Sequence, residues 1–194
     1  CSGACTSGVL SAIAAKGGFT GSLHPIQTFA DRQEGWRGLY NIYFGFEGSH
    51  EAQKAAEIIV KAFCGQLLLI DSDAKPLYHA AACVLSNYSV VLSYIAAALL
   101  RSAGLDAEAG IKAFVPLSLK TVKNIELLGP ESALTGPISR GDSCVIAQHL
   151  DAMEKKCPQF IEAYKTLGRT ALDIALKKGS ISEENERRLR ELLT

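Results

Sequence analysis

The chain has 194 residues, of which 48% are hydrophobic and 21% are charged, a balance that suits one or two compact domains with a buried core. Lysine plus arginine and aspartate plus glutamate both number 20, so the chain lacks the basic excess that nucleic-acid and anionic-membrane binding use. We therefore expect a small-molecule partner and no nucleic acid.

The first 72 residues alternate short apolar runs with helical stretches, which is typical of α/β units. Expected strands are Phe19 to Leu23, broken by His24-Pro25, then Tyr40 to Phe46, and a last buried strand over Gln66 to Ile70. Helices are expected over Ser7 to Lys16 and from a Ser49 cap to about Phe63, the second with Ala55, Ile58, Ile59 and Ala62 as its apolar face.

From residue 73 onward the pattern predicts helices only, so we place a domain boundary there, with domains 1–72 and 73–194. The expected helices cover Pro76 to Ser102, Asp106 to Leu128 with a kink or break at Pro116, Ser143 to Lys155, Pro158 to Lys178 and Ser182 to Leu193. Asp142 is well placed to cap the helix that starts at Ser143.

One expected helix is long and apolar enough to be either a membrane span or a buried helix of a soluble domain. Ala80 to Leu100 contains no charged residue over 21 positions, about the length that spans a bilayer. It does contain three serines, an asparagine and two tyrosines, and it lacks a basic asymmetry at its flanks. We expect a largely buried central helix and no membrane association. The six cysteines form no C-x-x-C pair, and the N-terminus shows no signal-peptide pattern, which favours reduced thiols in the cytoplasm.

Several common catalytic motifs are absent from the sequence. No two glycines stand in G-x-G spacing, so the turn that holds a dinucleotide pyrophosphate is missing. A Walker A loop, an H-E-x-x-H pair and a G-x-S-x-G elbow are also missing.

Polar residues at helical spacing form a stripe on an otherwise apolar helix. At about 100° per residue, the stripe contains Lys75, His79, Cys83, Ser86 and Ser93, with Asn87 and Ser89 at its edges and Val90 interrupting it. Such a stripe is costly unless its members are paired or face a wet cleft. His79 and Asn87 are therefore either core residues bonded to neighbouring backbone or members of a site. His79 and Cys83 alone are too few for a metal site, so we predict none.

Two further segments are candidates for binding. The loop Leu134 to Asp142 is either a rigid connection or a site where Arg140 and the backbone of Thr135 and Gly136 bind a polar or anionic group. His24, at the carboxyl end of an expected strand, is either a turn residue or a pocket wall.

The phrases SGxxxSxVL, GSLHPIQTFA, LYHAAACVLSNY and ALTGPISRGD occur in this order. In them the chain resembles Rossmann-like oxidoreductases whose C-terminal half is a domain of unknown function, within the wider group of 6-phosphogluconate dehydrogenase-like and pyrroline-5-carboxylate reductase-like proteins. The resemblance implies the carboxyl-terminal portion of an NADP-binding Rossmann domain, followed by an all-α substrate and dimerisation domain. It also implies that the glycine-rich turn and most of the coenzyme domain lie upstream of Cys1.

The resemblance also implies roles for individual residues. Cofactor-binding residues would be Ser2, Gly3, His24, Pro25 and Gln27. Substrate-binding residues would be Ser86, Thr135, Gly136, Arg140 and Asp142, and the catalytic residues would be His79, Lys75 and Asn87. In β-hydroxyacid dehydrogenases the catalytic lysine is followed four residues later by asparagine, whereas here Lys75 is followed by His79. Since imidazole titrates nearest neutral pH, His79 is at least as good a proton donor as Lys75.

We therefore expect an NADP-dependent reductase or dehydrogenase that moves a hydride to or from a C=O or C=N carbon of a small substrate. It would act as a homodimer joined through the helical domain. The competing hypothesis is a non-catalytic helical dimerisation or ligand-binding module that lacks the coenzyme-binding half.

Overall fold

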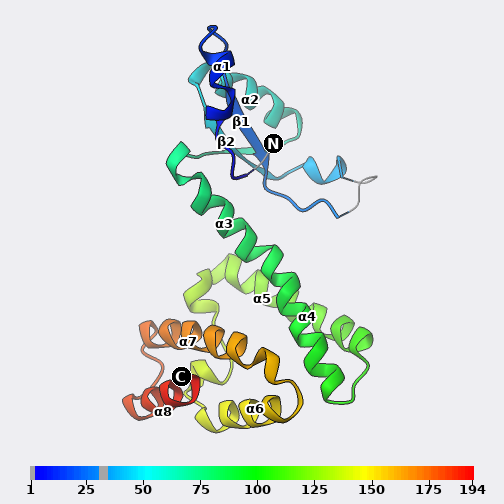
Figure 1. Cartoon of the computed structure of the whole chain (residues 1–194), viewed down its shortest axis with the longest axis vertical. Helices are drawn as coiled ribbons and strands as arrows, with labels where there is room; N and C mark the ends of the chain where they lie inside the picture. The colour runs from blue at the N-terminus through cyan, green and yellow to red at the C-terminus, as the bar shows by residue number, and fades with distance from the viewer. Residues whose placement is uncertain (1–2, 31–34) are drawn as a thin grey trace. The chain divides into compact units, whose positions relative to one another are not determined.

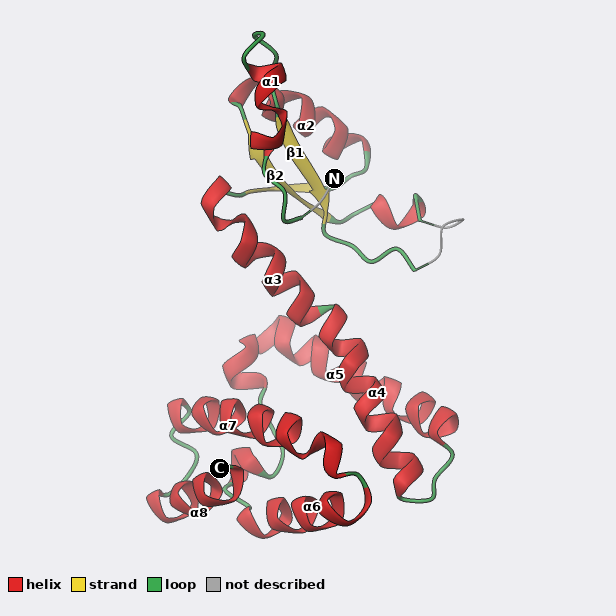
Figure 2. Ribbon diagram, viewed as in Figure 1, coloured by secondary structure: helices red, strands yellow, loops and turns green. Residues whose placement is uncertain are grey.

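The computed structural model describes residues 3–30 and 35–194, and it divides the chain into two compact units. Unit 1 ends at Val91 and unit 2 starts at Leu92 (Figure 1). Figure 2 shows strands only in unit 1, and after Leu69 the chain contains helices and loops alone. The strands therefore end where the sequence predicts the change to all-α structure. The assignment of 1–72 and 73–194 as functional domains stays a prediction.

Unit 1 contains a small mixed sheet and the helices around it. In chain order its elements are η1 (Ser7–Leu10), α1 (Ser11–Ala14), β1 (Gly21–Pro25), η2 (Arg37–Leu39), β2 (Tyr43–Gly48), α2 (His50–Ala62), β3 (Gln66–Leu69), η3 (Ser72–Ala74) and α3 (Lys75–Leu85). The strand order is β1-β2-β3, with β1 antiparallel to β2 and β2 parallel to β3. Helix α2 makes the crossover between the two parallel strands, as a βαβ connection requires.

Strand β1 differs from the prediction at its end. The strand includes His24 and Pro25, which pair with Gly45 and Phe44 of β2. Proline is tolerated there because it is the last residue of a strand at the edge of the described sheet, where no further ladder bond is needed from its nitrogen. The predicted break before His24 is therefore wrong, and His24 lies on the sheet.

Helix α2 starts where predicted but buries a different face. Ser49 caps it, because its side-chain oxygen accepts a hydrogen bond from the Ala52 amide at 3.3 Å. Its buried residues are Ala56 and Val60, four residues apart, whereas Ile58 and Ile59 are exposed. The helix has apolar residues on more than one side, and periodicity alone could not decide which side meets Phe44 and Phe46 of the sheet.

The predicted helix over 76–102 is two helices, α3 and α4 (Asn87–Ser102). The break falls at Ser86, whose backbone angles of φ −100° and ψ −67° depart from helical values. Beside it, the Ser89 hydroxyl donates to the Leu85 carbonyl at 2.6 Å and so competes with the backbone ladder. A stripe drawn on one continuous helix therefore does not continue past Ser86.

The prediction that this stretch is largely buried is wrong for the chain by itself. Ser72–Ser102 is long and apolar enough to cross a membrane, with a mean hydropathy of 1.8, and none of its most apolar window is buried. Length and composition are the whole of that evidence, and a single such stretch is weak evidence for a membrane span. Strand β3 shows the same departure, because Leu68 and Leu69 of the expected buried strand are exposed.

Unit 2 is built from helices around a small core. After the carboxyl-terminal part of α4 come α5 (Ala107–Ala133), η4 (Ile138–Arg140), α6 (Ser143–Lys156), η5 (Pro158–Phe160), α7 (Ile161–Lys177) and α8 (Glu183–Leu193). The core consists of Ile146, Leu172, Leu189 and Leu193, each 0–1% exposed. Asp106, Asp142 and Ser182 cap α5, α6 and α8 through their side-chain oxygens, as the sequence predicts for Asp142.

Helix α5 continues through Pro116 with helical backbone angles, so the predicted break there is wrong, whereas the predicted end at Leu128 is next to the residue that leaves helical geometry. The non-helical residue is Gly129, at φ 79° and ψ 161°. Glycine tolerates this positive φ, and the following Pro130 disfavours helical geometry in the residue before it. The two residues together set the kink, whereas Pro116 is accommodated inside the helix.

Candidate functional site

Two elements of unit 1 bring polar side chains together at the carboxyl end of β1. His24 lies on β1, and Tyr78 and His79 lie on the first turns of α3. The His24 Nδ1 atom and the Tyr78 hydroxyl are 2.7 Å apart, and the two rings meet edge to face with centroids at 5.8 Å. The His24 and His79 ring centroids are 6.2 Å apart. All three side chains are half-buried.

Two glycines make room for this arrangement, which we call the histidine cluster (His24, Tyr78 and His79). Gly45 is the register partner of His24, and a β-carbon on it would lie 2.6 Å from the Tyr78 hydroxyl oxygen. A β-carbon on Gly3 would lie 2.9 Å from the His24 ring and would collide with the His79 ring. Glycine at both positions therefore lets the backbone approach the aromatic side chains closely.

The environment fixes the protonation of two members of the cluster. Burial lowers the pKa of His24, and the nearby His79 lowers it further, so His24 is neutral at neutral pH. Burial raises the pKa of Tyr78, so its hydroxyl keeps its hydrogen. Within the described residues that hydroxyl has no acceptor other than His24 Nδ1. We therefore assign Tyr78 as the donor, which leaves the imidazole hydrogen on Nε2.

Lys75, one turn before His79 on α3, is buried, and its ammonium group is bonded to several partners. It is 1% exposed, and its Nζ atom donates to Ser22 Oγ at 2.6 Å and to the Cys5 carbonyl. It also forms an ion pair with Glu47 Oε2 at 3.7 Å. These partners occupy the ammonium group and hold its protons away from solvent, so the geometry favours His79 over Lys75 as a proton donor. Lys75 instead fixes the start of α3.

Glu47 completes this buried network. Its carboxylate accepts hydrogen bonds from the Ser7 amide and hydroxyl, both at 2.6 Å, and from the Ser72 hydroxyl at 2.9 Å. Burial by itself would raise the pKa of Glu47, but the bonds from Ser7 and Ser72 and the charge of Lys75 outweigh it and hold the pKa below its ordinary value. Glu47 is therefore ionised, and it pairs with Lys75 as a charged group.

The other residues predicted on the long helix lie apart from the cluster. Ser86 and Asn87 are exposed, at the break between α3 and α4. Cys83 is one turn beyond His79, with its Sγ atom 3.8 Å from His79 Nδ1. Among the described residues no group of three or more histidine, cysteine, aspartate or glutamate side chains could hold a metal ion.

The predicted cofactor residues are divided in the same way. Gly3 and His24 belong to the cluster, and Pro25 follows on β1. Gln27 is used by its own loop, because its amide donates to the Gly38 carbonyl at 3.4 Å and accepts from the Thr28 amide at 2.9 Å. Ser2 lies outside the described residues.

The loop residues Thr135, Gly136, Arg140 and Asp142 belong to unit 2, and the contacts described for them are local ones. Asp142 accepts from the Val145 amide at 3.1 Å as the α6 cap, and its own amide donates to the Pro137 carbonyl at 2.9 Å. Gly136 adopts φ 95°, and the side chains of Thr135 and Arg140 are exposed. These contacts describe a structured connection, and a binding role for it stays a prediction.

Tyr78, Glu47 and Ser22 were not singled out from the sequence. A signal existed for Glu47, because a carboxylate inside an aromatic strand needs a buried partner. Tyr78 stands directly before His79, yet nothing in the sequence pairs it with His24, which is 54 residues away.

The comparisons with known proteins bear on this geometry. A family model described as a domain of unknown function, DUF2520, matches residues 42–171, which is more than half of the chain. The chain belongs to the DUF2520 family. The search of curated proteins found no match.

Two solved structures resemble this DUF2520 protein over most of its length. The crystal structure of protein TM1727 from Thermotoga maritima is 27% identical, with a TM-score of 0.75, over 92% of this chain and 68% of that one. The structure titled "putative NADP oxidoreductase BF3122" from Bacteroides fragilis is 25% identical, with a TM-score of 0.71, over 89% of this chain and 63% of that one. The fold is therefore of a Rossmann-like oxidoreductase type, with a small α/β region and a helical part.

The Glu47 network predicts a pH dependence of stability. The folded pKa of Glu47 lies below its ordinary value of 4.5, so the stabilisation is complete above that pH and is lost as the pH falls through the folded pKa. We expect Glu47→Gln to cost about 3 kcal/mol at neutral pH, since Lys75 keeps a buried charge. We also expect it to flatten the fall in urea-unfolding free energy below about pH 4.5. Glu57→Gln, on the exposed side of α2, is the control, and parallel pH profiles for wild type and Glu47→Gln would contradict the assignment.

The hydrogen bond to His24 predicts a single tautomer. In nitrogen-15 NMR of the wild type at neutral pH, His24 should show a protonated Nε2 and an unprotonated Nδ1. Tyr78→Phe removes the donor, so the two tautomers should mix and the free energy of unfolding should fall by about 1 kcal/mol. Tyr43→Phe, at an exposed position on β2, should leave the His24 signals unchanged. An unaltered tautomer in Tyr78→Phe would show that Tyr78 does not orient the ring.

Proposed function

We propose that this protein is part of an NADP-dependent oxidoreductase that moves a hydride between the coenzyme and a C=O or C=N carbon of a small molecule. The observation that carries the proposal is the close approach of Gly3, His24 and His79 at the end of β1, in a fold whose Bacteroides fragilis neighbour is named for NADP. Open α/β sheets bind their ligands at the carboxyl ends of strands.

The residues present fit only one end of such a coenzyme. Gly3 brings the backbone close to His24 and His79, which suits a flat ring and its reacting partner. The chain has no G-x-G turn, so it does not supply the pyrophosphate site. In this proposal that turn lies upstream of Cys1, in the remainder of a 6-phosphogluconate dehydrogenase-like coenzyme domain. When bound, the coenzyme supplies the hydride.

His79 is the proposed proton carrier of the reaction. It stands one turn along α3 from Lys75, whose buried bonds to β1 and β2 hold that end of the helix in place. His24 stays neutral and offers its Nε2–H as a donor, because Tyr78 occupies Nδ1. A carbonyl or imine substrate would accept a hydrogen bond from His24 and a proton from His79.

Two tests address this function. NADPH is titrated into this chain, and into the chain joined to any sequence that its gene encodes before Cys1, with coenzyme fluorescence as the readout. We expect binding by the longer protein, and failure of both proteins to bind NADPH would contradict the proposal.

The second test measures turnover. A metabolite mixture screened by NADPH consumption first supplies a substrate. His79→Gln should lower turnover by on the order of a hundredfold with an unchanged melting temperature, while the exposed His50→Gln should match wild type. A loss of stability with unchanged turnover would make His79 a structural residue.

An exposed apolar surface on unit 2 supports association with another protein chain. It favours the alternative function, a non-catalytic helical association module. It equally fits the homodimer that we expect for the oxidoreductase. Helix α5 exposes eight large apolar side chains: Phe114, Val115, Leu117, Leu119, Val122, Ile125, Leu127 and Leu128. A helix that is apolar on most sides is normally buried, and single monomeric proteins rarely expose such contiguous surface. We propose that a second copy of the chain covers α5.

The described cysteines are free thiols, which fits the cytoplasmic location that we also propose.

The association proposal has its own readout. Val122 and Leu119 are 64% and 65% exposed, so lysine at both positions should leave the fold intact and convert a dimer to a monomer in sedimentation velocity. Leu167→Lys, at a 51% exposed position on α7, should leave the dimer unchanged. A wild-type monomer would contradict the proposal, and so would a wild type that requires detergent to stay in solution, since lipid would then be the partner of α5.

A further inference from the structure

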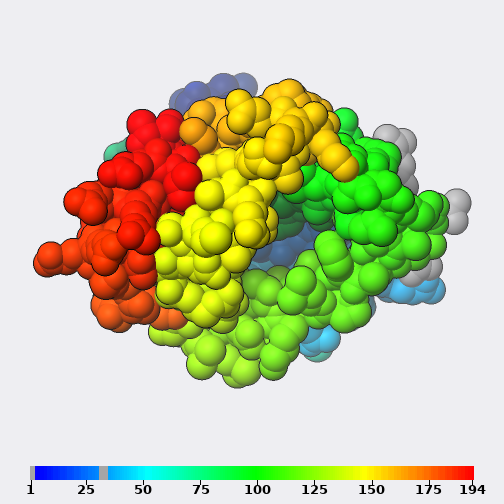
Figure 3. All heavy atoms as spheres, turned by 90° about the horizontal axis from the view of Figure 1, so that it is seen from below, coloured from blue at the N-terminus to red at the C-terminus, as the bar shows by residue number. Residues whose placement is uncertain are grey.

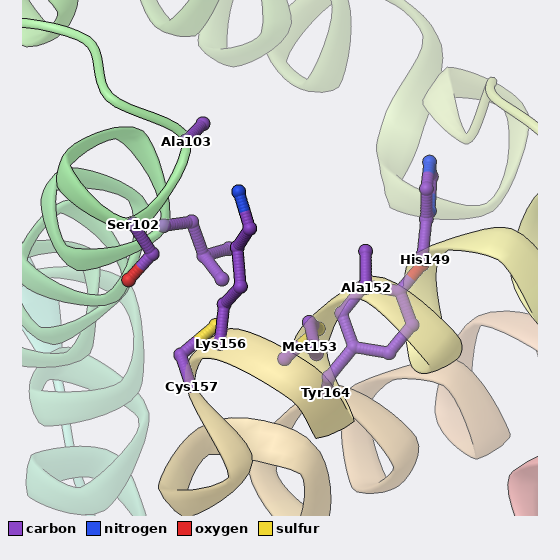
Figure 4. A pocket seen from close by; sticks show the side chains of 9 residues that line it. Ser102, Ala103, His149, Ala152, Met153, Lys156, Cys157 and Tyr164 are labelled. Atoms are coloured by element: carbon purple, nitrogen blue, oxygen red, sulfur yellow. The ribbon is translucent and has the colours of Figure 1, made fainter.

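Unit 2 contains a hollow that the proposed reaction does not use. It lies between the end of α4 and the helices α6 and α7, and its volume is about 390 Å³. Figure 3 shows the surface of unit 2 hollowed between the green and the yellow-to-orange segments, and Figure 4 shows the lining side chains. The size is within the range of small-molecule sites.

Most of the lining is apolar. Leu99 comes from the last turn of α4 and Ala103 directly follows that helix, while Ala152, Met153 and Cys157 come from α6 and the residue after it. Met153 and Cys157 are 4% and 3% exposed, so they form a fixed floor. These walls would exclude water from an apolar group and would gain contact area with it.

Three of the four polar lining side chains come from α6 and α7, and the fourth, Ser102, is the last residue of α4. His149 and Lys156 are seven residues apart on α6, which places them two turns apart on the same face. Figure 4 shows both extending in the same direction from α6. The His149 Nδ1 atom is 2.8 Å from the Tyr164 hydroxyl of α7, and their rings meet edge to face with centroids 6.0 Å apart.

The charges of the α6 and α7 side chains point to an anion. Lys156 has no carboxylate or other polar partner within the described residues, whereas the neighbouring Lys155 is paired with Asp151 at 2.6 Å. Burial raises the pKa of Tyr164, so its hydroxyl keeps its hydrogen and can donate to His149 Nδ1. The remaining imidazole hydrogen is then on Nε2. The hollow thus offers one cation and one imidazole N–H beside apolar walls.

We infer that this hollow binds a small carboxylic acid with an apolar body, which we call the acid pocket. The carboxylate has two oxygens, one for the Lys156 ammonium and one for the His149 N–H, and the apolar body rests on Met153 and Cys157. The acid pocket is lined by residues of unit 2 alone, and none of them belongs to the histidine cluster. Its ligand can be detected without coenzyme and without any turnover.

The test compares an acid with its neutral analogue. In NMR titrations of the whole chain, 3-phenylpropanoate should bind at least about threefold more tightly than 3-phenylpropanamide, because only the acid pairs with Lys156. Resonance shifts should fall on α6 and the end of α4. Equal binding of acid and amide would overturn the proposal, and so would the absence of binding by either.

Three variants locate the site. Lys156→Gln should remove most of the preference for the acid, while Lys155→Gln, the same change of charge one residue away, should retain it. Equal effects of the two would overturn the assignment of Lys156. Ala152→Trp, at an exposed position, should fill the acid pocket and abolish binding of both probes without lowering the melting temperature. If Ala152→Trp instead dissociates an assembly and the wild type binds neither probe, the hollow is occupied by a second copy, and the small-molecule inference is wrong.

Discussion

The buried ion pair between Lys75 and Glu47 holds the α/β unit and its candidate site together. Taking an ammonium and a carboxylate out of water costs several kcal/mol, and the pair is tolerable only because Ser7, Ser22, Ser72 and the Cys5 carbonyl complete their hydrogen bonds. Those partners come from the N-terminal segment, β1 and the turn before α3, while Glu47 lies on β2. The first residue of α3 is thereby tied to two strands, and the residues one turn later are placed with it.

The histidine cluster depends on that placement. Tyr78 and His79 are adjacent in the chain and point to the end of β1 because α3 starts at a fixed point against the sheet. The approach is possible only because Gly45 and Gly3 lack side chains. The result is a neutral, oriented imidazole at His24 beside a second imidazole, which is a division of roles suited to donating a hydrogen bond and moving a proton. Lys75, the other candidate proton donor, has its ammonium group bonded to Ser22, Glu47 and the Cys5 carbonyl, and a catalytic role for it stays a prediction.

The two units differ in how completely they bury their own surfaces. The small core of unit 2 is shielded from solvent, with Ile146, Leu172, Leu189 and Leu193 at 0–1% exposure, while much of α5 and of the Ser72–Ser102 stretch is exposed. An apolar sequence pattern predicts that a surface will be buried. It does not predict whether the same chain or another molecule buries it. The expectations of a buried central helix and a buried β3 failed for this reason.

The sequence by itself determined the order of the elements, the change from α/β to all-α structure after residue 72, and the caps at Ser49 and Asp142. These are local properties, set by periodicity and by side chains that bond within three residues. It also singled out His24, His79 and Gly3. Only the tertiary structure decided that Ser86 interrupts the long helix, that α5 continues through Pro116, and that Ala56 and Val60 are the buried face of α2. It also revealed Tyr78 as the partner of His24 and Glu47 as the partner of Lys75. Those pairs join residues 54 and 28 positions apart, and no local rule of spacing links residues that only a completed sheet brings together.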